Sequence, residues 1–67
     1  MEIDDIRALT NDELDTELND SRRELMNLRF REATMQLVNV HEIKKVRRRI
    51  ARMSTVMRER EMAKAAR

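Results

Sequence analysis

Two stretches of this 67-residue chain carry apolar side chains at the spacing of one helix face. The first stretch steps by four and three residues through Leu14, Leu18, Ser21, Leu25 and Leu28. The second stretch steps by three and four residues through Ile43, Val46, Ile50, Met53 and Met57. Because such steps keep side chains on one side of an α-helix, the sequence predicts two amphipathic helices.

Capping motifs locate the start of each helix. Thr10 precedes Glu13 by three residues, so the Thr10 hydroxyl can accept a hydrogen bond from the Glu13 amide while the Glu13 carboxylate reaches back to the Thr10 amide. Asn39 and Glu42 repeat this spacing. We therefore expect one helix over residues 11–36, a bend over 35–39, a second helix over 40–61 and a frayed tail over 62–67.

Two helices joined by a short bend most simply form an antiparallel hairpin. The expected fold class is therefore all-α, with residues 1–67 forming a single helical-hairpin domain. Before the first helix, Ile3, Ile6 and Leu9 recur every three residues, which indicates a short N-terminal turn folded back over the apolar seam. The same two apolar stripes could instead pair between chains in a dimeric coiled coil, and this alternative stays open.

The residue types that the sequence lacks exclude several function classes. Without glycine no phosphate-cradling loop can form, and without cysteine and with a single histidine no zinc or disulfide framework can be assembled. Two exposed helices offer no dry pocket, so we expect no enzyme, metal, cofactor or small-molecule substrate. No apolar run approaches the ~20 residues of a membrane span, and the acidic start is unlike a targeting signal, so we expect a cytoplasmic protein without a membrane partner.

The net charge of +2 conceals a steep gradient along the chain. Residues 1–21 hold one base against eight acids, residues 22–38 hold four bases against two acids, and residues 39–67 hold ten bases against three acids. Six of these bases fall within nine residues of the second helix, with no acid between them: Lys44, Lys45, Arg47, Arg48, Arg49 and Arg52. An asymmetry of this kind indicates that one end of the molecule meets a polyanion.

The nature of this polyanion follows from the side chains around the bases. A helix face that only contacts solvent usually has acids interleaved with its bases, but the segment 44–52 contains no acid. The chain has one aromatic residue, Phe30, so stacking on single-stranded bases is not favoured. We expect phosphate contacts to folded, double-helical RNA or DNA without sequence readout, and a DNA-compacting protein is a weaker alternative.

The first helix carries a second apolar line, roughly 100° to 160° around the helix from the leucine seam. Its members are Met26, Phe30, Ala33 and Leu37. One interpretation is that they pack on the bend and on the start of the second helix. The other is a docking patch for another macromolecule, with Arg29 and Arg31 beside it reaching phosphates.

Together, residues 24–37, 43–53 and 55–60 resemble the bacterial family of large-subunit ribosomal protein number twenty-nine. The most specific elements are Asn27-Leu28-Arg29-Phe30 and Ile50-Ala51-Arg52, and the resemblance covers nearly the whole chain. It implies a two-helix hairpin that is a structural constituent of the large ribosomal subunit. It also implies contact with large-subunit rRNA near the exit of the nascent-chain tunnel, beside ribosomal protein number twenty-three.

The resemblance also implies which bases bind RNA. Carried over by position, these are Arg29, Arg31, Lys44, Lys45, Arg47, Arg48 and Arg52. Arg49 is basic where the family commonly has an acid or a small polar residue, so we expect it to strengthen phosphate binding. Met35 replaces the usual glycine before Gln36-Leu37, and Val40 stands where proline often opens the second helix, so we expect the first helix to run longer than is usual.

Overall fold

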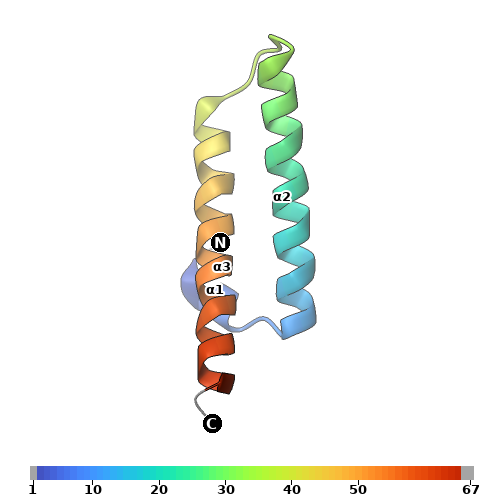
Figure 1. The fold of residues 1–67 in the computed structure, drawn as a ribbon. Coiled ribbons are helices and arrows are strands. Elements are labelled where there is room, and N and C mark those ends of the chain that lie inside the picture. The colour runs from blue at the N-terminus through green and yellow to red at the C-terminus, as the bar shows by residue number, and fades with distance from the viewer. Residues whose placement is uncertain (1, 66–67) are drawn as a thin grey trace.

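The structure, a computed structural model, describes residues 2–65 and measures 49 Å along its long axis and 17 Å across. It consists of α1 (Ile3–Arg7), α2 (Asn11–Ala33) and α3 (Val40–Ala65). The two long helices lie side by side and antiparallel, and α1 lies against the C-terminal half of α3 (Figure 1). Residues 2–65 contain no strand, so the predicted all-α hairpin is confirmed.

Both long helices begin where the capping motifs predict. The Glu13 amide donates to Thr10 Oγ1 at 3.2 Å, which fixes the start of α2. The His41 amide donates to Asn39 Oδ1 at 2.9 Å at the start of α3. These bonds satisfy backbone donors that have no partner within the helix, so each cap favours helix formation at that residue.

The bend begins earlier than the sequence predicts, because α2 ends at Ala33 and not at residue 36. Met35 has a φ of 60°, in the left-handed region. The Gln36 amide donates to the Arg31 carbonyl at 2.9 Å, and the Met35 amide donates to the Glu32 carbonyl at 3.1 Å. This pair of bonds is the Schellman motif, which ends a helix and normally uses glycine at its left-handed position. Methionine adopts that conformation here, so α2 ends at Ala33, three residues before the predicted end at residue 36.

The end of α3 also differs from the expectation, because the helix continues to Ala65 where fraying was expected from residue 62. The residues of this segment are good helix formers, and a helix already fixed by packing extends at little cost. Apolar periodicity is therefore not needed to keep 62–65 helical. The remainder of the predicted tail, residues 66–67, lies outside the described residues.

The core joins all three helices. Its buried members are Ile6, Leu14, Leu18, Met53 and Val56, with Ile3, Leu9, Ile50 and Met57 partly buried around them. The predicted N-terminal turn is α1, and Ile6 at its centre is fully buried. Val56 lies in the core beside the predicted stripe position Met57, because α1 widens the apolar face of α3 that must be covered.

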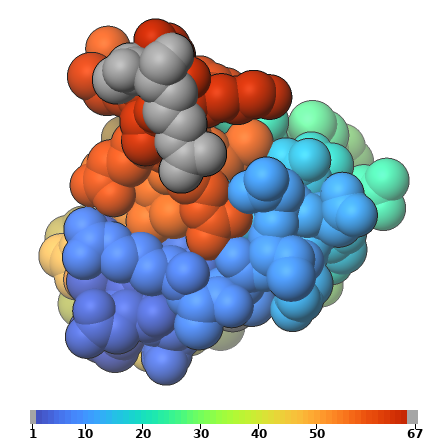
Figure 2. Space-filling model, turned by 90° about the horizontal axis from the view of Figure 1, so that it is seen from below, coloured from blue at the N-terminus to red at the C-terminus, as the bar shows by residue number. Residues whose placement is uncertain are grey.

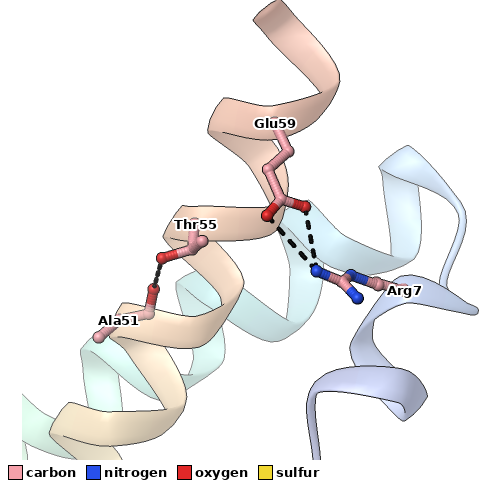
Figure 3. A network of polar contacts seen from close by, with 4 residues as sticks. All are labelled: Arg7, Ala51, Thr55 and Glu59. Carbon is pink, nitrogen blue, oxygen red and sulfur yellow. Dashed lines mark hydrogen bonds and ion pairs between the residues drawn. The ribbon is translucent and has the colours of Figure 1, made fainter. Parts of the chain in front are cut away.

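Polar contacts from the last turns of α3 hold the N-terminal segment in place. Arg7 Nη2 lies 3.4 Å from Glu59 Oε1 in an ion pair between α1 and α3 (Figure 3). The Arg60 guanidinium donates to the Leu9 carbonyl at 2.7 Å, to the Arg7 carbonyl at 3.3 Å and to Asn11 Oδ1 at 2.7 Å. Seen from this end, the N-terminal segment packs against both α3 and the start of α2 (Figure 2).

Candidate nucleic-acid interface

The basic residues of α3 lie on the sides of the helix that the hairpin leaves uncovered. Ile43 and Val46, which alternate with these bases in the sequence, are buried. The exposed bases are Lys44, Lys45, Arg47, Arg48 and Arg52, and Arg49 is partly buried at the edge of the helix pair. The packing of α3 thus determines which charges face outward, as the amphipathic pattern predicts.

Two shallow depressions indent this basic surface. The first is lined by Lys44, Arg47, Arg48 and Ala51, and we call it the Ala51 depression. The second is lined by Lys45, Arg48, Arg49 and Arg52, and we call it the Arg52 depression. Arg48 borders both, so its side chain separates two places where an anion could bind.

The cations of the Ala51 depression are available to an external anion. Lys44, Arg47 and Arg48 make no side-chain hydrogen bond or ion pair within residues 2–65. Three positive charges on adjacent turns repel one another, and an anion placed between them relieves that repulsion. The depression therefore favours binding of a phosphate.

Two cations of the Arg52 depression already have carboxylate partners. Lys45 Nζ lies 3.9 Å from Glu42 Oε1, and Arg49 Nη1 lies 3.1 Å from Glu24 Oε2 on α2. A phosphate bound here would compete with these carboxylates, so the depression is less favourable for an anion than its cation content alone indicates.

Arg49 occupies a different environment from the outward bases with which the sequence groups it. Its side chain is 31% exposed and donates across the hairpin to Glu24. In an antiparallel hairpin of the two stripes, the part of the first helix around Ser21 and Leu25 lies beside the middle of the second helix. The acid at position 24 was therefore a signal that could have identified this partner. A role for Arg49 in phosphate binding remains a prediction.

The second apolar line is exposed, with Met26, Phe30 and Ala33 on α2 and Leu37 beyond its end. Met26 is 72% exposed and Phe30 is 65% exposed, and Ala33 and Leu37 are exposed as well. The interpretation in which these side chains pack on the bend and on α3 is therefore wrong. Met35, which the sequence does not assign to this line, adds a further exposed apolar side chain at the bend.

The basic surface and the apolar line occupy the same half of the hairpin. Residues 26–37 and 40–52 lie toward the bend, whereas α1 and the start of α2 lie at the opposite end (Figure 1). Arg29 and Arg31 are exposed near the apolar line. The acidic first turn of α2, with Asp12 and Glu13, lies at the end of the hairpin away from the bend.

Other kinds of site find little support in the described part of the chain. Within residues 2–65 no group of three or more His, Cys, Asp or Glu side chains is arranged to hold a metal ion. None of the helices in this range has the length and apolarity to cross a membrane.

The chain is similar to known proteins over nearly its whole length. The model of a family described as Ribosomal L29 protein matches residues 4–60. The large ribosomal subunit protein uL29 of Pelotomaculum thermopropionicum is 50% identical over 62 residues, which cover 92% of each chain. The uL29 protein of Bacillus cytotoxicus is 52% identical over 92% of this chain and 94% of its own. The uL29 protein of Mycobacterium avium is 50% identical over 92% of this chain and 80% of its own.

Proposed function

We propose, from the premise that this chain belongs to the ribosomal L29 protein family, that it binds folded large-subunit rRNA through the outward basic surface of α3. Membership makes the chain a structural constituent of the large ribosomal subunit and not an enzyme. It acts in translation as part of a ribonucleoprotein, which in bacteria is cytoplasmic. The surface that contacts RNA, the location on the subunit and the neighbouring protein are parts of the proposal.

One observation carries the proposal for RNA binding. Lys44, Arg47 and Arg48 surround one depression, are exposed, and have no acidic partner in the described chain. Each phosphate that such cations neutralise releases a condensed counterion, which gives affinity without reading the sequence. The surface has cations but no aromatic side chain, so it suits backbone contacts to a folded RNA and not stacking on single strands.

We further propose that the exposed apolar line docks a neighbouring ribosomal protein. The resemblance points to ribosomal protein number twenty-three, near the exit of the nascent-chain tunnel. The proposed contacts are Met26, Phe30, Ala33 and Leu37. Their exposure supports this role, because large apolar side chains clustered on the surface of a small protein commonly mark an interface.

The packing of the two apolar stripes against each other within one chain favours a ribosomal hairpin over a free coiled-coil module. Leu14 and Leu18 share a core with Met53 within one chain, so these side chains are not available to a second copy. Sedimentation of the isolated chain tests this choice. A monomer with salt-sensitive rRNA affinity is expected, and a stable dimer without such affinity would contradict the proposal.

The RNA-binding surface is tested with Arg48→Glu, measured by titration against large-subunit rRNA transcribed in vitro at several salt concentrations. The expected result is weaker binding, with a log–log salt slope reduced by about 0.7 to 0.9 for each lost phosphate contact. Arg58→Glu makes the same charge change on an exposed part of α3 outside both depressions. Equal salt slopes for the wild type and Arg48→Glu would overturn the assignment of the RNA-binding surface. Equal affinity of the wild type for rRNA and for duplex DNA would favour a DNA-compacting protein.

A further inference from the structure

We propose that Ala51 makes the Ala51 depression a binding place for one phosphate of the RNA backbone, by leaving room between three cations. This inference rests on the proposed RNA-binding function and adds to it an uncharged residue that determines fit. Ala51 is exposed, so its small size is not required by packing within the hairpin.

Helix geometry places the four lining residues at the corners of one surface patch. Positions separated by three or four residues are neighbours on a helix, with Cβ atoms about 5–6 Å apart. Lys44, Arg47 and Arg48 occupy three corners, and Ala51 occupies the fourth. Three corners therefore supply donors, whereas the fourth supplies only a methyl group and lets a ligand approach the helix backbone.

The charges around Ala51 favour this place over the Arg52 depression. None of the three cations at the Ala51 depression has an acidic partner within residues 2–65. In the Arg52 depression, Lys45 and Arg49 pair with carboxylates. A phosphate entering the Ala51 depression thus displaces no carboxylate, which favours its binding there.

The helix surface also stays low in the turn that follows. The Thr55 hydroxyl donates to the Ala51 carbonyl oxygen at 2.9 Å, so its side chain bends back onto the helix (Figure 3). Ala51 and Thr55 thus occupy successive turns of α3, and neither side chain extends far from the helix backbone. These small side chains leave room for an RNA backbone held by Arg48 to continue along α3.

The experiment fills the depression without changing a charge. In Ala51→Leu, the larger side chain occupies the space between the cations, and helix propensity stays nearly the same. Titration against large-subunit rRNA transcribed in vitro should show affinity lowered about tenfold and a salt slope reduced by about 0.7 to 0.9, the loss of one phosphate contact. Circular dichroism should show unchanged helix content.

Two control variants separate a filled depression from other effects. Ala51→Ser keeps the side chain small and should bind as the wild type does. Ala63→Leu adds the same apolar group to an exposed position of α3 outside both depressions and should also leave binding unchanged. Equal losses for Ala51→Leu and Ala63→Leu would overturn the inference.

The outcome for Arg48→Glu distinguishes failure of this inference from failure of the proposed function. If Arg48→Glu weakens binding and Ala51→Leu does not, the phosphate lies elsewhere on the basic surface and the inference fails alone. If neither variant weakens binding, the RNA-binding surface is not on this face of α3, and both proposals fail.

Discussion

The Arg49 guanidinium donates to the Glu24 carboxylate at 3.1 Å and so links α3 to α2 across the hairpin. The two side chains are 31% and 44% exposed, so water screens their attraction. Pairs in this setting contribute roughly 0.2–1 kcal/mol to stability. Arg49 therefore supports the hairpin modestly, and its charge is partly neutralised within the chain.

Arg49→Gln should lower rRNA affinity less than Arg48→Gln does, because a phosphate would have to displace Glu24 to reach Arg49. The same variant should lower the free energy of unfolding by less than about 1 kcal/mol. Parallel rRNA titrations at one salt concentration, with urea unfolding followed by circular dichroism, measure both quantities. An affinity loss for Arg49→Gln that matches or exceeds that of Arg48→Gln would show that Arg49 leaves Glu24 on binding.

Met35→Gly should stabilise the isolated chain. A left-handed conformation costs a non-glycine residue roughly 1–2 kcal/mol, and the greater freedom of glycine in the unfolded chain offsets part of this gain. We expect the free energy of unfolding to rise by about 1 kcal/mol, measured by urea unfolding. Gln36→Gly is the matched control, because Gln36 lacks a positive φ and should lose stability on the same change. A loss of stability in Met35→Gly would show that the methionine side chain makes a compensating contribution.

The number, type and starts of the long helices follow from local signals in the sequence. Thr10 and Asn39 each cap a helix that begins at the next residue, and alternating steps of three and four residues depend only on helix geometry. The end of α2 could not be predicted in this way. The signal for a left-handed residue is glycine, and here Met35 adopts that conformation without it.

The features that the sequence concealed depend on contacts between distant residues. Val56 joins the core with Ile6, 50 positions away, and the leucine and methionine stripes do not reveal that contact. In the sequence, Arg49 is one of several bases in a basic run. Only the packing of α2 against α3 brings Glu24 beside it. The outward cations of α3 were predictable because burial of Ile43 and Val46 against α2 is enough to expose the bases that alternate with them.

Met53→Ala should destabilise the hairpin by about 2–5 kcal/mol, since truncating a buried methionine removes apolar contacts and leaves a cavity. Met53 is fully buried in the core that joins the three helices. Met62→Ala makes the same change on the same helix at a residue that is 62% exposed, and should alter stability by no more than about 0.5 kcal/mol. Urea unfolding of both variants checks the difference, and equal stabilities would show that Met53 does not pack as described.

Arg60→Met should loosen the N-terminal segment more than it weakens the helix pair. The guanidinium of Arg60 donates to the carbonyls of Leu9 and Arg7 and to Asn11 Oδ1, and methionine keeps the apolar stem but none of these bonds. We expect a loss of about 1–2 kcal/mol in the free energy of unfolding and faster amide hydrogen exchange in α1. Arg58→Met, an exposed neighbour, should leave both unchanged. If exchange in α1 is equally slow in Arg60→Met, then Ile6 alone is sufficient to hold this helix against α3.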